Sequence, residues 1–175
     1  MVNIRLAVPS DASDIAEILM RSWEAAYGNI IPTDFIEKKN AMRAEQFKRA
    51  ITEENNTYYI LQKDDKTAGY MRVVNVLSDN VFASEISDLE QIYLHPDYYR
   101  QGIGTRAMDF AYNTALSSGK TVMIVWVLAE NTAAIKFYKK CGFIADGEEK
   151  QREYGKVLTI IRMRKSLEQN KSPHF

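Results

Sequence analysis

The segment Tyr99-Arg100-Gln101-Gly102-Ile103-Gly104-Thr105 carries the most specific pattern in this chain. It follows an apolar, strand-like segment at 89–95 and a turn at Pro96-Asp97, and it leads directly into a helical pattern. Glycine has no Cβ, so its backbone can approach an anion closely. The first turn of a helix adds unpaired N–H groups and the positive end of the helix dipole. A Gly-x-Gly pair also occurs in ordinary turns, but in this setting it predicts a phosphate-binding loop.

Length and composition indicate a single globular domain. The chain has 175 residues, of which 46% are hydrophobic and 26% are charged, and this length allows a substantial core. We expect one domain over residues 1–165 and a polar tail over 166–175. Lys plus Arg and Asp plus Glu both number 23. This balance argues against bulk electrostatic binding to nucleic acid or to an anionic membrane.

Cysteine content and the N-terminal sequence favour the cytoplasm. The single cysteine, Cys141, excludes an intrachain disulfide, which fits a reducing compartment. We see no signal peptide and no apolar run of the roughly 18 residues that a membrane helix needs. No spacing of His, Cys, Asp and Glu suggests a metal ligand set, so no metal is expected.

Hydrophobic periodicity predicts strands interleaved with helices. The predicted strands are 2–6, 57–62, 67–77, 86–94, 121–128, 143–144 and 156–163, with a break at 78–80 after the third. The predicted helices are one that starts after Pro9-Ser10-Asp11 and runs up to Gly28, three over 35–39, 41–52 and 101–118, and one that follows the N-cap candidate Asn131 and ends before Gly142. This order indicates a mixed α/β fold with helices on both faces of a central sheet.

Three features coincide around the glycine loop. The strand at 89–95 precedes it, a helix follows it, and further along the chain Asn131-Thr132-Ala133-Ala134-Ile135-Lys136-Phe137-Tyr138 is followed by Cys141-Gly142-Phe143. In this combination the chain resembles the GCN5-related N-acetyltransferase (GNAT) family, over residues 2–165 and most specifically over 90–143. The resemblance implies a mostly antiparallel sheet of about seven strands and acetyl-CoA as the acyl donor. It also implies direct transfer to a primary amine.

The resemblance assigns the donor site residue by residue. Tyr99 stands where the family motif usually has Arg or Gln, which leaves a cradle built mainly from backbone N–H groups. A backbone N–H near Leu94 would polarise the thioester carbonyl. Tyr138 matches the tyrosine that faces the CoA sulfur and would protonate the departing thiolate. The residues expected to contact CoA are Ile92, Tyr93, Leu94, Arg100, Gln101, Gly102, Ile103, Gly104, Thr105, Asn131, Ala134, Phe137 and Tyr138.

A base is needed because an alkyl ammonium group has a pKa near ~10 and must lose a proton before it attacks. Glu90 is the first candidate, since in a regular strand it shares a face with Ile92 and Leu94. A water chain could replace it, and a carboxylate on a strand can also be held in an ion pair. Glu85 and Asp88 lie nearby in sequence and could bind a cationic acceptor.

The sequence predicts the acceptor substrate less specifically than it predicts the acyl donor. The segment Trp23 to Pro32 resembles a helix and loop of a bacterial branch in which some members acetylate polyamines. Trp23 and Tyr27 are four residues apart, so they share a helix face and either contact the acceptor or pack in the core. Acidic residues, including Glu24, Asp88 and Glu90, would suit a polyamine.

Three alternatives stay open for the function. The acceptor could be a protein N-terminus or lysine, or it could be an aminoacyl group. The chain could also be a regulator that binds acyl-CoA without catalysis. The resemblance further suggests a homodimer.

Overall fold

The computed structural model describes residues 1–53, 57–75 and 85–167. Its elements follow one another as β1 (Val2–Leu6), η1 (Pro9–Asp11), α1 (Ala12–Tyr27), α2 (Thr33–Asn40), α3 (Arg43–Thr52), β2 (Tyr58–Lys63), β3 (Lys66–Asn75), β4 (Ile86–Leu94), η2 (Pro96–Tyr98), α5 (Ile103–Ser117), β5 (Val122–Leu128), α6 (Thr132–Lys140), β6 (Ile144–Glu153) and β7 (Val157–Ser166). In the part of the chain described, no helix is both long and apolar enough to cross a membrane.

The strands form one seven-stranded sheet in the order β1-β2-β3-β4-β5-β7-β6. Every pair of neighbours is antiparallel except β4 and β5, which run parallel. The predicted mixed α/β fold with a mostly antiparallel sheet is therefore confirmed.

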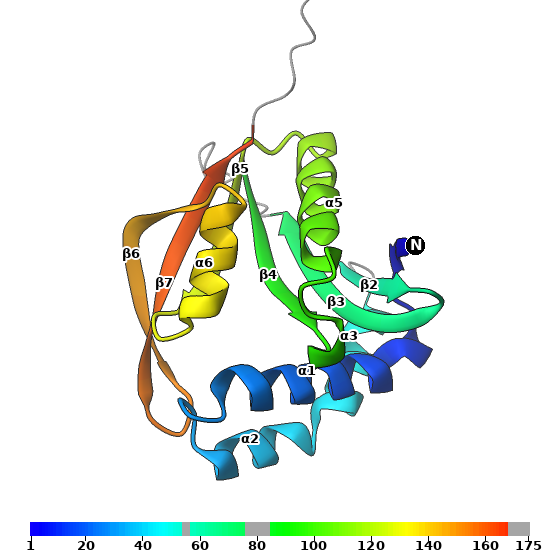
Figure 1. Cartoon of the computed structure of the whole chain (residues 1–175), viewed down its shortest axis with the longest axis vertical. Helices are drawn as coiled ribbons and strands as arrows, with labels where there is room; N and C mark the ends of the chain where they lie inside the picture. The colour runs from blue at the N-terminus through cyan, green and yellow to red at the C-terminus, as the bar shows by residue number, and fades with distance from the viewer. Residues whose placement is uncertain (54–56, 76–84, 168–175) are drawn as a thin grey trace, which may run out of the picture.

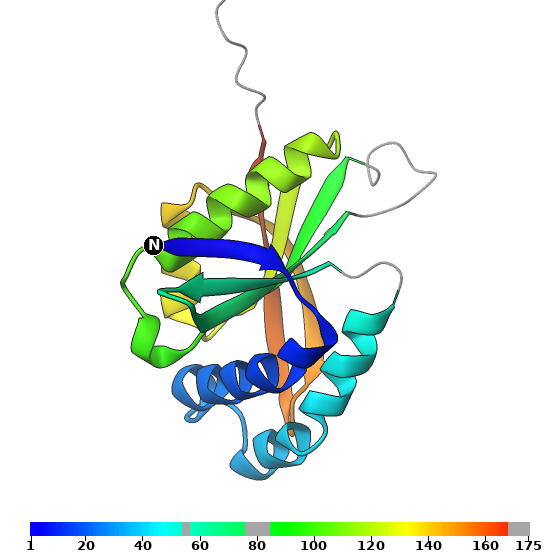
Figure 2. The same cartoon turned by 90° about the vertical axis from the view of Figure 1, so that its right-hand side faces the viewer.

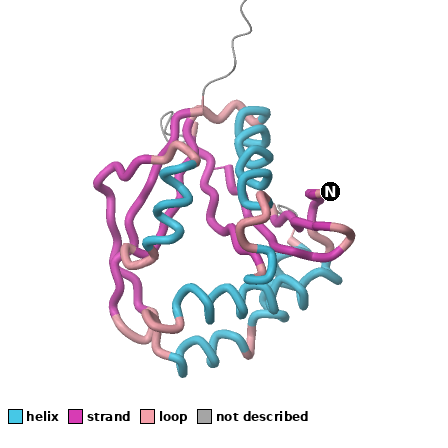
Figure 3. The backbone as a smooth tube through the Cα atoms, in the orientation of Figure 1, coloured by secondary structure: helices cyan, strands magenta, loops and turns pink. Residues whose placement is uncertain are grey.

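Helices cover both faces of the sheet. Buried residues of α5, with Tyr138 of α6, pack on one face against Met71, Leu89, Met123 and other strand residues. On the other face, α1 and α3 pack against Tyr58, Ile60 and Tyr70. Figure 2 shows α3 on the side of the sheet opposite α5. In Figures 1 and 3, the helices α1, α2 and α3 gather at one end of the molecule.

The two parallel strands at the centre of the sheet stay together only at their beginnings. Ile86, Ser87 and Asp88 of β4 pair with Val122, Met123 and Ile124 of β5, and their described register ends there. Both strands continue beyond this point, to Leu94 and Leu128. The facing edges of their second halves are therefore left without a strand partner.

A β-bulge interrupts β4 at Glu90. Arg72 of β3 pairs with Gln91, and the next residue of β3, Val73, pairs with Leu89, so Glu90 is the extra residue. Leu89 consequently packs in the same core cluster as Ile92 and Leu94. The prediction that Glu90 shares a regular strand face with Ile92 and Leu94 is wrong, because a bulge reverses the alternation of side chains.

The C-terminal strands differ most from the prediction. β6 is ten residues long, rather than the two residues expected at 143–144, and β7 continues to Ser166. Leu167 is 7% exposed, so the chain is still packed at this residue, and the domain boundary at 165 stays a prediction. The expected break at 78–80 and residues 168–175 of the predicted tail lie outside the described residues.

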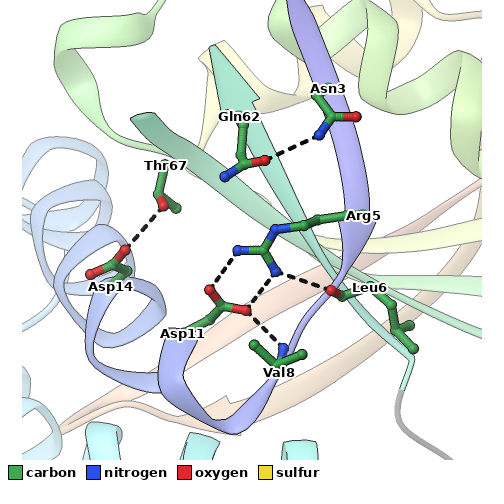
Figure 4. A network of polar contacts seen from close by, with 8 residues as sticks. All are labelled: Asn3, Arg5, Leu6, Val8, Asp11, Asp14, Gln62 and Thr67. Atoms are coloured by element: carbon green, nitrogen blue, oxygen red, sulfur yellow. Dashed lines mark hydrogen bonds and ion pairs between the residues drawn. The ribbon is translucent and has the colours of Figure 1, made fainter. Parts of the chain in front are cut away.

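An ion pair joins β1 to the start of α1 (Figure 4). Arg5 donates from Nη1 and Nη2 to Asp11 Oδ2 and Oδ1 at 2.8 and 2.7 Å, and the Val8 amide donates to Oδ2 at 2.7 Å. The hydrogen bonds from Arg5 lower the pKa of Asp11, against the opposing effect of its burial. Nearby, Thr67 donates a hydrogen bond to Asp14 at 3.0 Å.

Asp11→Asn is expected to lower the free energy of unfolding by about 2 kcal/mol at pH 7, because a charge-assisted bidentate contact is lost. The lowered pKa means that this stabilisation is present above the unfolded-state value of about 3.9 and disappears as the pH falls through the folded-state value. Wild type and variant should therefore converge in acid. Urea denaturation across pH measures this.

Asp14→Asn is the matched control, since Asp14 lies in the same first turn with an exposed side chain. It should cost less than about 1 kcal/mol. Equal free energies of unfolding for Asp11→Asn and wild type at pH 7 would contradict the stabilising role of the Arg5–Asp11 ion pair.

Candidate active site

A cleft of about 1650 Å³ opens where β4 and β5 part. Its walls come from α1, the second half of β4, the start of α5, β5, α6 and the β6–β7 hairpin. The predicted site residues that line it are Trp23, Tyr27, Asp88, Glu90, Ile92, Tyr93, Leu94, Arg100, Gly102, Ile103, Gly104, Thr105, Asn131, Ala134, Phe137 and Tyr138.

Gln101 is the one predicted site residue that does not line the cleft. Its Nε2 donates to the carbonyl of Asp97 at 2.7 Å, and its Oε1 accepts a hydrogen bond from Lys63. The side chain of Gln101 is thus used to hold the loop, and only its backbone remains available for the predicted contact with a phosphate.

The glycine loop forms one end of the cleft. Gly102 has a φ of +79°, a conformation that favours glycine. A Cβ on Gly104 would lie 3.2 Å from Cζ of Phe137, so the bare backbone lets the start of α5 approach α6 closely. The first N–H groups of α5 have no partner within the helix. Arg100 and Lys136 line the same cleft, and the loop thus fits a pyrophosphate.

The free edge of β4 supplies backbone groups to the cleft. The amide of His95 donates to the carbonyl of Ala68 on the β3 side at 2.9 Å. Because backbone groups alternate along a strand, the N–H and C=O of Leu94 face the other way, toward β5. The carbonyl accepts a hydrogen bond from Oγ of Ser22 in α1. The N–H of Leu94 is therefore oriented as an oxyanion donor should be.

Tyr138 lies inside the cleft on α6. Its side chain packs between the rings of Phe137 and Phe143, with centroids 5.5 and 5.8 Å away, and the residue is only 7% exposed. Burial raises the pKa of Tyr138 above its usual range. The hydroxyl therefore stays protonated at neutral pH, as a proton donor must.

Two carboxylates of β4 line the cleft: Glu90 is held in an ion pair, and Asp88 is more enclosed. Glu90 accepts from Nη1 of Arg72 at 2.7 Å, in a pair whose side chains are each about a third exposed. Asp88 is more enclosed, and its Oδ1 is buried with no hydrogen-bond partner in the part of the chain described. Burial raises the pKa of Asp88 to about 6, and the charge of Glu90 adds to the rise, whereas Lys150 and Arg72 oppose it.

The aromatic pair of α1 forms a wall of the cleft and is partly built into the core. Tyr27 is 9% exposed, and burial raises its pKa to about 12. Nδ2 of Asn131 donates to the Tyr27 hydroxyl at 3.3 Å, while Oδ1 of Asn131 caps α6 by accepting from the Ala134 amide at 3.0 Å. The guanidinium of Arg43 lies 4.5 Å from the ring centroid of Trp23.

The cleft residues that were not assigned from the sequence include Trp126, Lys150, Arg152 and Tyr154. Three of them belong to β6 and the adjoining turn, in a segment whose expected strand was too short. Nearly every residue of β6 is exposed, so the segment lacks the apolar alternation that identifies a strand. The charged residues from Glu148 to Glu153 gave no other indication in the sequence that this segment lines the cleft.

The described residues give little support to a nucleophilic role for Cys141 or to a metal site. The Cys141 thiol is partly buried, and burial raises its pKa, which disfavours the nucleophilic thiolate. Among the described residues, no group of three or more His, Cys, Asp or Glu side chains is placed to hold a metal ion.

The glycine cradle, the parted strands and the buried tyrosine together define an acyltransferase that uses an acyl-CoA donor. Residues 13–143 match the model of the Acetyltransferase (GNAT) family. The chain belongs to this family and is an acetyl-CoA-dependent N-acetyltransferase.

The chain shares 25% sequence identity or less with the following three proteins. The chain is 25% identical over 161 residues to an uncharacterized N-acetyltransferase of Methanocaldococcus jannaschii, covering 92% of this chain and 67% of that protein. It is 23% identical to the peptidyl-lysine N-acetyltransferase YjaB of Salmonella typhimurium, covering 93% and 97%. The solved structure of the PaiA N-acetyltransferase of Thermoplasma acidophilum, in complex with coenzyme A, superposes with a TM-score of 0.79 at 19% identity and 95% and 99% coverage.

Gly104→Val should weaken the binding of CoA at least about tenfold, because the added side chain overpacks the contact with Phe137 and displaces the loop. Isothermal titration calorimetry with CoA measures the Kd. Gly147→Ala is the control, since Gly147 has a φ of +89° but lies outside the cleft. An unchanged Kd for Gly104→Val would count against the phosphate site.

Proposed function

We propose that this enzyme transfers the acetyl group of acetyl-CoA directly to the primary amine of a small molecule. The observation that carries the proposal is that the buried Tyr138 lines the same cleft as the glycine loop and as Asp88, whose Oδ1 is buried with no hydrogen-bond partner among the described residues. In the reaction the amine nitrogen forms a bond to the acetyl carbon and the bond from that carbon to sulfur breaks. The amine proton goes to a base, and the thiolate takes a proton from an acid.

Tyr138 acts as that acid. Its hydroxyl remains protonated over the working pH range, and a phenol in water has a pKa of about 10, against about 8.5 for a thiol. The rings of Phe137 and Phe143 hold the side chain in place. The N–H of Leu94 stabilises the negative charge that develops on the carbonyl oxygen.

Asp88 takes the amine proton through a chain of water molecules, in preference to Glu90. A useful base has a pKa near the working pH, and that of Asp88 is about 6. Glu90 remains the second candidate, but proton uptake by Glu90 would give up its ion pair with Arg72.

A small amine suits the acceptor end of the cleft, where α1 and the β6–β7 hairpin contribute walls. A polyamine is supported by the carboxylates of Asp88 and Glu90. A lysine side chain is supported by the name of the Salmonella relative. A panel of spermidine, amino acids, a lysine peptide and an N-terminal peptide, followed by thiol release from acetyl-CoA, separates these acceptors.

Location and assembly remain predictions. A lone cysteine supports the cytoplasm. The homodimer rests on the family resemblance, and light scattering tests it.

Tyr138→Phe should lower kcat by about 100-fold, which is the lower range for loss of a general acid. The Kd for acetyl-CoA should stay within about twofold, because the phenyl ring preserves the packing. Tyr59→Phe is the control, since Tyr59 packs against Phe110 and does not line the cleft. An unchanged kcat in Tyr138→Phe would remove this residue from the acid role.

In the wild type, kcat/KM should rise with pH through about 6 as Asp88 loses its proton. Asp88→Asn should abolish this limb of the profile. Glu90→Gln should keep it but move it to lower pH, since loss of a neighbouring negative charge lowers the pKa of Asp88. Arg72 and Lys150 are the cations that act on Asp88 in every profile. If instead Glu90→Gln removes the limb and Asp88→Asn retains it, Glu90 is the base.

A further inference from the structure

The helix that carries Tyr138 is short and buries little surface of its own. All nine residues of α6 are described, and Tyr138 alone among them is buried. A helix of this length is marginally stable in isolation, so contacts with the rest of the protein decide where it lies. The place of the Tyr138 hydroxyl therefore depends on what holds the two ends of α6.

The C-terminal end of α6 is held to β7 and to α5. The carbonyl of Cys141, the residue that follows the helix, accepts hydrogen bonds from Nζ of Lys165 at 2.8 Å and from the hydroxyl of Tyr112 at 3.1 Å. Nζ of Lys165 also lies 3.9 Å from the ring centroid of Tyr112. A cation at the last carbonyls of a helix suits the negative end of its dipole. These contacts fix this end of the helix to the core of the domain.

The N-terminal end of α6 is held to α1 through one side chain. Asn131 is the N-cap, and its Oδ1 accepts a hydrogen bond from the Ala134 amide at 3.0 Å. Its Nδ2 donates to the hydroxyl of Tyr27 at 3.3 Å. Both polar atoms of the Asn131 amide group thus take part in a hydrogen bond, and the two bonds join the start of α6 to α1.

Tyr27 is itself held in place, so it can serve as a fixed point for α6. Its side chain is 9% exposed and packs in a cluster with Ile31 and Leu158. Its ring lies edge-on to that of Trp23, with the centroids 5.4 Å apart. A hydroxyl on a ring packed in this way has a defined position, and its bond to Asn131 relates the position of α6 to that of α1.

We infer that Tyr27 is a positioning residue, whose hydrogen bond to Asn131 sets the place of α6 and thereby of the Tyr138 hydroxyl. The inference rests on the proposed role of Tyr138 as the acid. Asn131 and Tyr138 are seven residues apart, which is about two helical turns, so they lie on one face of α6. Without the bond to Tyr27, α6 remains tied only at Cys141 and can tilt about that end. A misplacement of about 1 Å can cost as much as 100-fold in rate.

Tyr27→Phe removes the hydroxyl and keeps the ring, so it breaks this hydrogen bond with little change in packing. Thiol release is measured at saturating acetyl-CoA with the most active amine of the panel described above. We expect kcat to fall about tenfold, whereas the KM for the amine and the Kd for acetyl-CoA should stay within about twofold. A raised amine KM at unchanged kcat would make Tyr27 an acceptor-binding residue and would overturn the inference.

Tyr70→Phe is the matched control. Tyr70 is 0% exposed and does not line the cleft, and its hydroxyl has no hydrogen-bond partner in the part of the chain described. The same chemical change should therefore leave kcat unaltered, and a tenfold loss here too would overturn the inference. Asn131→Ser breaks the bond from its other side, since serine still caps a helix but is too short to reach Tyr27. It should reproduce the loss in kcat at saturating acetyl-CoA.

A double-mutant cycle determines whether Tyr27 acts through Tyr138. In the Tyr138→Phe background there is no acid left to position, so the further change Tyr27→Phe should alter kcat by less than about twofold. A tenfold loss in both backgrounds would mean that the two residues act independently, and it would overturn the positioning role.

Amide hydrogen exchange separates failure of this inference from failure of the proposed function, because it requires no turnover. With CoA bound, residues 132–140 should exchange faster in Tyr27→Phe than in the wild type or in Tyr70→Phe. Unchanged exchange would overturn the inference. Faster exchange, combined with an unchanged kcat in Tyr138→Phe, would contradict the acid role and leave the bond between Tyr27 and Asn131 as the contact that holds α6.

Discussion

The separation of β4 from β5 is the constraint on which the rest of the molecule depends. Two parallel strands at the centre of a sheet normally satisfy each other's backbone groups, but here the shared register ends at Asp88 and Ile124. Beyond it, polar backbone groups face an open cleft, and such groups need a partner. Ser22 of α1 supplies one for the carbonyl of Leu94. The remainder form a site that an extended ligand with amide groups can complete.

The two ends of that cleft are built on different physical principles. The donor end uses backbone N–H groups and the absence of side chains at Gly102 and Gly104, so it depends on one continuous loop. The acceptor end uses charged and aromatic side chains from α1, β4, β5 and the β6–β7 hairpin. The first kind of site is local in the chain, whereas the second exists only once remote segments have come together.

This difference explains what could be predicted from sequence. The bounds of β4 at Ile86–Leu94 followed from periodicity, and the start of α5 followed from the glycine loop to within two residues. The residues predicted for the donor site line the cleft, apart from Gln101. The bulge at Glu90 could not be predicted, because it depends on the pairing of β4 with Arg72 and Val73 of β3. Lys150 and Arg152 were missed because an exposed strand has no apolar periodicity. The side chain of Gln101 does not line the cleft, because its contacts with Asp97 and Lys63 decide its direction; its contact with CoA through the backbone stays a prediction.

The exposure of β6 has a consequence for how molecules of this enzyme behave at high concentration. β6 is the last strand of the sheet, and its outer row of backbone groups could extend the sheet into a neighbouring molecule. The charged side chains between Glu148 and Glu153 oppose such growth, since addition of a further strand would bury them. Replacing Lys150 or Arg152 by an apolar residue would therefore alter the colloidal behaviour of the enzyme.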